Sequence, residues 1–129
     1  MTPEEQKTMN DMKRDFNISG QSKHPNRITI HPSESPEHFM AKCHLCYLLF
    51  KKKIPFETEF KIPGMMGKFN IPDILIFNIP STILQAIEIM HSESEDEYLN
   101  KIKKSKDGIF FMKIKSDQAL KITDIGELL

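Results

Sequence analysis

The chain has 129 residues, 18 of them basic and 18 acidic, so its formal net charge is zero. This length suits one domain with a single core, and the charge balance provides no global positive field for nucleic acid, so any such binding needs a local patch. No apolar run reaches the roughly 18 residues that span a bilayer, and the N-terminus lacks the layout of a signal peptide. We therefore expect a soluble, cytoplasmic protein without a membrane partner.

Residues 1–34 are predicted to form a polar N-terminal arm that is extended or partly disordered. Turn-forming residues are scattered through this segment, and its one apolar run is the short stretch from Ile28 to Ile30. The folded domain is expected to comprise residues 35–129.

A helix is predicted from Ser35 to about Lys53. Ser35 suits the N-cap, Pro36 the first turn and Glu37 the positive end of the helix dipole. One apolar stripe follows at helical spacing, formed by Phe39, Cys43, Cys46, Tyr47 and Phe50. Because no second cysteine pair is present to complete a structural zinc site, the two cysteines are interpreted as reduced core residues.

Three strands are predicted next. Residues 56–62 alternate, with Glu57 and Glu59 on the polar face, and a turn at Pro63 and Gly64 follows. A second strand runs from Pro72 and Asp73 to residue 77, and a third covers residues 82–90, apolar on both sides except at two positions, which favours a central place in the sheet.

A second helix is predicted from Ser92 or Ser94 to Lys106, with acids in its first turn and lysines near its end, as the helix dipole prefers. Gly108 ends it, residues 109–114 form a fourth strand, and residues 117–129 form a short helix with an apolar tail. The predicted order is therefore α, β, β, β, α, β and a final α.

Two acids stand on these apolar strands, where an unpaired carboxylate is costly. Asp73 opens the run from Ile74 to Phe77, and Glu88 lies inside the run from Ile83 to Met90. Such acids must be paired, protonated or bound to a cation. A Pro-Asp turn would also explain Asp73, and an ion pair with a lysine of the first helix would explain Glu88. Together, on adjacent strands, they suggest a divalent metal site.

This element order, with Pro72-Asp73 opening the second strand and Glu88 on the third, resembles the PD-(D/E)xK nuclease superfamily over about residues 35–115. The resemblance implies an α/β fold with a restriction-endonuclease-like αβββαβ core, in which a central mixed sheet is flanked by helices. It also implies a Mg²⁺- or Mn²⁺-dependent endonuclease that hydrolyses DNA phosphodiester bonds, and a homodimer. Asp73 and Glu88 would be metal ligands, with the backbone carbonyl of Ile89 near the metal.

The sequence departs from the superfamily pattern at Met90, where the resemblance leads us to expect a lysine. A lysine there polarises the attacking water or stabilises developing charge. Replacements for it are Lys101 or Lys104 on the second helix, Lys61 on the first strand, and His91. Without a replacement, the domain is a catalytically silent module that binds nucleic acid or a protein partner; a small structural protein with a buried ion pair is the third possibility.

The site residues that we predict fall into three groups. The catalytic group consists of Asp73, Glu88, Glu59 and Lys101, and the metal ligands are Asp73, Glu88 and Ile89. The nucleic-acid-binding group, which includes Glu37 as the match to an acid on the superfamily's first helix, consists of Glu37, His38, Lys61, Lys68, His91 and Lys104.

Overall fold

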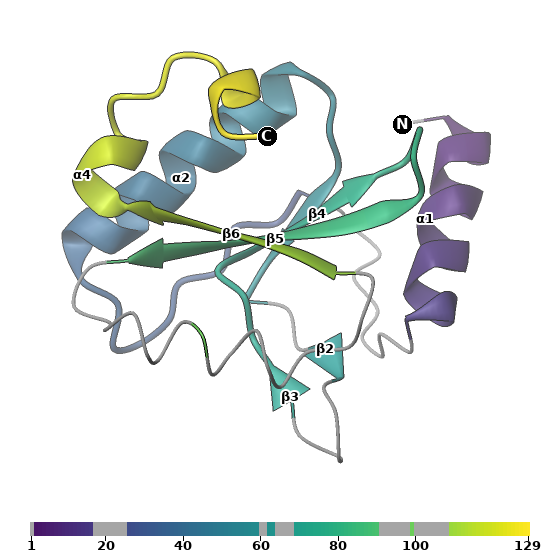
Figure 1. Cartoon of the computed structure of the whole chain (residues 1–129), viewed down its shortest axis with the longest axis horizontal. Helices are drawn as coiled ribbons and strands as arrows, with labels where there is room; N and C mark the ends of the chain where they lie inside the picture. The colour runs from purple at the N-terminus through teal and green to yellow at the C-terminus, as the bar shows by residue number, and fades with distance from the viewer. Residues whose placement is uncertain (1, 17–25, 60–61, 64–68, 91–98, 100–108) are drawn as a thin grey trace.

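The computed structural model describes all residues except 1, 17–25, 60–61, 64–68, 91–98 and 100–108. Its centre is a four-stranded mixed sheet in the order β1-β4-β5-β6 (Figure 1). The strands are β1 (Phe56–Thr58), β4 (Ile74–Asn78), β5 (Ile83–Met90) and β6 (Ile109–Lys115). A separate two-stranded sheet pairs β2 (Ile62–Pro63) with β3 (Phe69–Asn70).

The direction of the strands confirms the predicted α/β class. β1, β4 and β5 pair antiparallel in succession, with Thr58 opposite Ile74 and Ile74 opposite Ile87. β6 then pairs parallel with β5. Because two neighbouring parallel strands need a long crossover, the chain between β5 and β6 must return along the sheet. The helix predicted at 92–106 falls in this segment, and apart from Leu99 it lies outside the described residues.

The N-terminal arm differs from the prediction, because it contains the helix α1 (Pro3–Asp15). Thr2 and Glu5 form a capping box, in which each side chain accepts a hydrogen bond from the backbone N–H of the other residue. Met9 and Met12 lie on one face of this helix and are buried. The capping box and the methionine spacing were both present in the sequence, so this helix was predictable.

The helix predicted from residue 35 is α2 (Pro36–Lys51), which begins as expected with Ser35 as its N-cap. After β6 come the short helix α4 (Ser116–Ala119) and the 3₁₀ turn η2 (Ile125–Glu127). Figure 1 shows α2 and α4 side by side on one side of the sheet, with α1 apart from them at the sheet's other end. Within the described parts of the chain, no helix is long and apolar enough to cross a membrane.

Two apolar clusters pack against the two faces of the sheet. On the face toward α2, Leu45 and Leu49 meet Ile87 and Ile89 of β5. On the face toward α1, Met9 and Met12 meet the strand residues whose side chains point the other way, including Leu84 and Ala86 of β5. Because side chains alternate along a strand, this division assigns each residue of β5 to one face.

Candidate functional site

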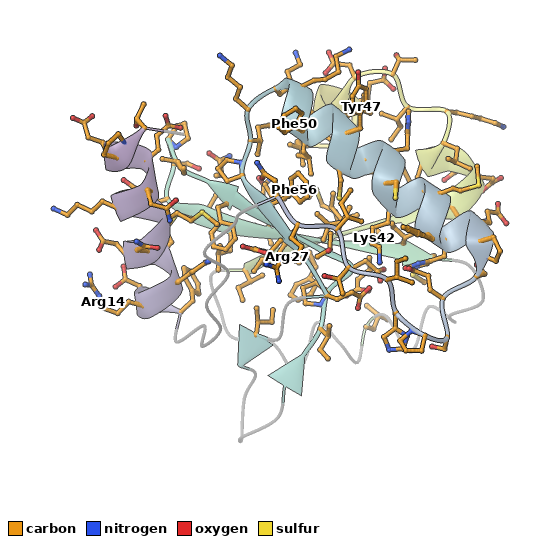
Figure 2. The ribbon with its side chains drawn as sticks, turned by 180° about the vertical axis from the view of Figure 1, so that it is seen from behind. Arg14, Arg27, Lys42, Tyr47, Phe50 and Phe56 are labelled. Carbon is orange, nitrogen blue, oxygen red and sulfur yellow. The ribbon has the colours of Figure 1, made fainter. Side chains whose placement is uncertain are left out.

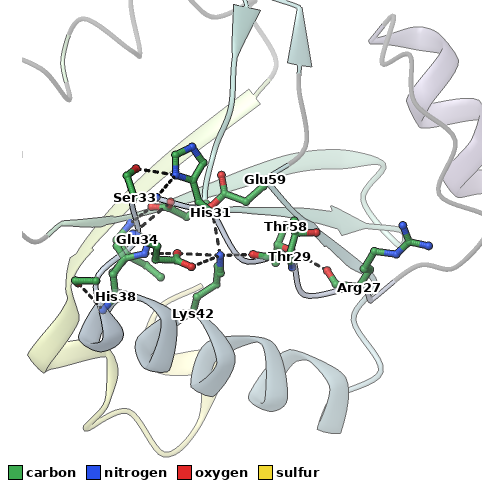
Figure 3. Close-up of polar contacts among 12 residues, drawn as sticks. Arg27, Thr29, His31, Ser33, Glu34, His38, Lys42, Thr58 and Glu59 are labelled. Atoms are coloured by element: carbon green, nitrogen blue, oxygen red, sulfur yellow. Dashed lines mark hydrogen bonds and ion pairs between the residues drawn. The ribbon is translucent and has the colours of Figure 1, made fainter.

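A cluster of charged side chains lies between the start of α2 and the ends of β1 and β4. Its acids are Glu34, Glu59 and Asp73, and its bases are His38 and Lys42. Figure 3 shows four of these five residues, with the backbone of residues 27–34 running beside them. The segments that bring them together are distant in sequence, so the cluster exists only in the folded chain.

The segment before α2 is tied to the edge strand β1. The side-chain hydroxyl of Thr58 accepts a hydrogen bond from the N–H of Thr29 at 2.7 Å and donates one to the carbonyl of Arg27 at 2.8 Å. The N–H of Phe56 donates to the side chain of Asn26 at 3.1 Å. These bonds cover the edge of the sheet and deliver Glu34 to the first turn of α2.

Lys42 is the fully buried cation of the cluster. Its ammonium lies 2.8 Å from Glu34 and 3.4 Å from Glu59, and it also donates to the carbonyl of Thr29 (Figure 3). An ammonium has three N–H donors, and here three acceptors surround it. Lys42 therefore holds two acids and the arm together, and it has no donor to spare for a bound molecule.

His38 bridges two acids of the cluster. Its Nδ1 meets Glu34, and its Nε2 lies 3.3 Å from Oδ1 of Asp73. The hydrogen bond with Asp73 contributes most to raising the pKa of His38 to about 9, against an opposing effect of burial. At neutral pH the imidazole is therefore protonated and donates from both nitrogens.

Asp73 is fixed by the backbone of the neighbouring strand. Its Oδ2 accepts a hydrogen bond from the N–H of Ile89 at 2.7 Å, immediately beyond the last paired residues of β4 and β5. The resemblance implied a metal near the Ile89 carbonyl, whereas the contact that the structure shows is made by the Ile89 N–H. One carboxylate oxygen of Asp73 is thus bound to the backbone N–H of Ile89, and the other lies toward His38.

Glu59 approaches the same place because the backbone leaves the strand after Thr58. Its φ is 51°, in the left-handed region that a non-glycine residue rarely adopts, and its N–H donates to the carbonyl of Asp73 at 3.3 Å. Burial raises the pKa of Glu59, and the charge of Asp73 raises it further. By contrast, hydrogen bonds from Lys42 and His38 overcome the effect of burial and lower the pKa of Glu34.

The cluster carries an excess of negative charge. Three carboxylates face one ammonium and one imidazolium, which leaves a net charge of minus one. The pKa of Glu59 is raised chiefly by burial, and the charge of Asp73 adds to this effect. Carboxylate oxygens are the ligands that hard divalent cations prefer.

The donors fit such a cation in type but are incomplete in number. Glu59 and Asp73 supply carboxylates, but within the described ranges no three His, Cys, Asp or Glu side chains form a group that could hold a metal. A third ligand would have to come from a rearranged side chain, from water or from outside the described ranges.

Glu88, the second predicted metal ligand, lies on β5. It lies between Ile87 and Ile89, which pack toward α2, so alternation along β5 directs its side chain to the α1 face with Ala86. It is 1 % exposed and pairs in register with Lys113 of β6. Asp73 and Glu88 therefore lie on neighbouring strands as the sequence predicts, and the register that pairs Ile74 with Ile87 places them opposite each other just beyond the last paired residues.

A second buried acid shares the face of Glu88. Glu57 is 2 % exposed and lies 3.7 Å from Lys13 of α1. The α1 face thus buries acids near lysines from other elements, which is a structural arrangement of charges.

The remaining predicted residues are more scattered. Glu37 is half-buried in the first turn of α2. Five of the predicted residues lie outside the described part of the chain: Lys61, Lys68, His91, Lys101 and Lys104. The cysteines are free thiols, with Cys46 buried and Cys43 half-buried.

Two members of the cluster were missed in the sequence, namely Glu34 and Lys42. Glu34 seemed to belong to a polar arm, and Lys42 follows Ala41 in a helix rich in lysines. A signal was available for Lys42, because it falls on the inward-facing side of α2 together with Phe39, Leu45 and Leu49. A charged residue at such a position needs a buried partner.

Comparisons with protein-family models, with curated proteins and with solved structures found no match.

Proposed function

We propose that the chain is a metal-dependent nuclease domain of the PD-(D/E)xK type that acts on DNA. The strand arrangement supports this fold: a helix, three antiparallel strands and a fourth strand parallel to the third, in the sheet order β1-β4-β5-β6. These elements match the described part of the αβββαβ order that the resemblance implies; the second helix of that order was predicted at residues 92–106, which apart from Leu99 lie outside the described residues.

The observation that carries the proposal is the excess negative charge at the open end of the β4–β5 ladder. Glu59 and Asp73 are in contact there: the N–H of Glu59 donates to the carbonyl of Asp73 at 3.3 Å, and the charge of Asp73 adds to the effect of burial in raising the pKa of Glu59. In this proposal they hold Mg²⁺ or Mn²⁺, which when bound would lower the pKa of a water molecule and neutralise charge on the phosphate.

The other residues of the cluster position this pair. The N–H of Ile89 fixes one oxygen of Asp73, and Lys42 contacts both Glu59 and Glu34 and favours their charged forms. His38, protonated at neutral pH, adds a positive charge beside Asp73 that suits a phosphate oxygen. None of these residues supplies the lysine missing at Met90, because the ammonium of Lys42 is already surrounded by acceptors.

Two observations favour a second candidate function, a catalytically silent module with the same fold. Lys42 and His38 already neutralise two of the three acids, and Met90 stands where the superfamily pattern has a lysine. In this alternative the domain binds DNA without cutting it.

The test is cleavage of supercoiled plasmid and of branched DNA by the full chain with Mn²⁺, with Mg²⁺ and with EDTA. We expect cleavage with either metal and none with EDTA. Asp73→Asn keeps the shape of the side chain but removes its charge, and it should lower the rate roughly 100-fold or more. DNA binding without metal dependence or cleavage would instead establish the silent module.

The matched control is Asp117→Asn. Asp117 is an exposed acid in the first turn of α4, and no contact of the cluster involves it. This variant should cleave like the wild type. Equal losses in both variants would show that the effect of Asp73→Asn is not specific to the cluster, and the nuclease assignment would fail.

A further inference from the structure

The outward face of α2 is apolar, which is unusual for a helix on a protein surface. Met40 is 61 % exposed, Tyr47 58 % and Phe50 60 %. Figure 2 shows Tyr47 on the side of the helix opposite the sheet, and Lys42 on the side toward it. Since the inner face of α2 is also apolar, this helix is hydrophobic almost all round, a pattern typical of helices that are covered on both sides.

The three exposed residues and the half-buried Cys43 form a seam with the spacing of a helix–helix contact. Met40, Cys43, Tyr47 and Phe50 follow one another at intervals of three, four and three residues. This alternation is the a/d pattern by which two helices pack side chains into each other. The seam is therefore suited to another α-helix.

The charges beside this seam suit a second copy of α2 in the opposite direction. Glu37 flanks the seam in the first turn, and Lys51 flanks it in the last turn. In an antiparallel pair, Glu37 of each copy comes close to Lys51 of the partner subunit, and opposite ends of the two helix dipoles lie together. A parallel pair would bring like charges and like dipole ends together.

We propose that the chain forms a homodimer through the antiparallel pairing of α2 along the seam of Met40, Cys43, Tyr47 and Phe50. The cluster around Lys42 lies on the opposite side of this helix, so pairing leaves it uncovered. One helix pair buries less area than a standard protein–protein interface, so we expect a dissociation constant in the micromolar range, on the order of 1–100 µM. This proposal does not depend on the nuclease assignment.

The first experiment measures the mass of the full chain by sedimentation equilibrium over a range of concentrations. The wild type should shift from monomer to dimer, and Phe50→Glu should remain monomeric. Phe110→Glu is the matched control, because Phe110 is an equally exposed phenylalanine, 56 %, on β6 and outside the seam. A wild type that stays monomeric, or a dimer that Phe110→Glu disrupts and Phe50→Glu does not, would overturn the proposal.

The second experiment tests the antiparallel direction by charge reversal. Glu37→Lys and Lys51→Glu should each weaken the dimer roughly tenfold, because each places like charges beside each other twice per dimer. The double variant should restore the wild-type affinity. The contrary outcome is a double variant that dimerises as weakly as the single variants while its circular dichroism spectrum shows an unchanged fold. In that case the two residues do not meet across the interface, and the antiparallel pairing is wrong.

Discussion

At the scale of single residues, the candidate site has two cations with different roles. Lys42 is inaccessible and makes contacts to two acids and a carbonyl, so it holds the cluster together. His38 lies nearer the surface, with 17 % of its side chain exposed, and it connects Glu34 to Asp73. Of the two, His38 is the residue that can exchange a proton with solvent in the range of ordinary pH.

The raised pKa of His38 predicts a pH dependence of stability. A histidine of the unfolded chain titrates near 6.5, and folding raises the pKa of His38 to about 9. Its stabilising contribution is therefore complete below about pH 6.5 and is lost as the pH rises through 9. Urea unfolding of the metal-free protein between pH 6 and pH 10 should show this decline.

The control for this prediction is His38→Gln, which removes the titrating group. The difference in unfolding free energy between wild type and variant should shrink between about pH 6.5 and 9. A difference that stays constant across this range would show that folding does not raise the pKa of His38.

At the scale of elements, α2 connects the two proposals. One side of it presents His38 and Lys42 to the acid cluster, and the other presents the apolar seam. Its start is fixed by Ser35, whose hydroxyl accepts a hydrogen bond from the N–H of His38 at 3.1 Å. The N-cap thus sets the position of the residue that bridges Glu34 and Asp73.

Removal of this cap is expected to weaken both the helix and the cluster. Ser35→Ala should lower the free energy of unfolding by about 1 kcal/mol, the usual effect of losing an N-cap side chain. Ser33→Ala is the control, since Ser33 is exposed, lies just before the helix and bonds with His31. This control should change stability by less than about 0.5 kcal/mol in urea unfolding. Equal effects would mean that Ser35 does not act as a cap.

At the scale of the whole molecule, the sheet separates two sets of buried charge. The α2 face carries the cluster of Glu34, Glu59 and Asp73, while Glu57 and Glu88 are directed to the α1 face. In the first set, Glu34 and Glu59 share the ammonium of Lys42, and in the second Glu57 lies beside Lys13 of α1. We therefore expect the two sets to respond differently to substitution.

Glu88→Gln tests this separation. Because Glu88 is buried, loss of its charge should lower the unfolding free energy by roughly 1–3 kcal/mol. Mn²⁺ binding, measured by electron paramagnetic resonance, should remain within about twofold of the wild type, because alternation along β5 directs the Glu88 side chain to the α1 face, whereas His38 and Lys42 belong to α2. A variant of unchanged stability that no longer binds Mn²⁺ would instead make Glu88 a metal ligand.

The local elements were largely predictable because each depends on neighbouring residues. Ser35 and Pro36 begin a helix wherever they occur before an apolar periodic segment, and the run from Ile83 to Met90 forms a central strand because it is apolar on both sides. The missed helix α1 also had a local signal in Thr2 and Glu5. His38, Glu59 and Asp73 could be chosen from the sequence as chemically suitable residues, but their contacts with one another could not.

The sequence by itself determined the α/β class, the positions of the strands and the presence of acids on apolar segments, because side-chain periodicity and capping are properties of short segments. Only the tertiary structure decided which acids meet. The turn of the backbone at Glu59 and the path of residues 26–34 along β1 bring Glu34 and Glu59 to Lys42. Strand alternation, with Ile87 and Ile89 packed toward α2, directed the side chain of Glu88 to the other face of β5.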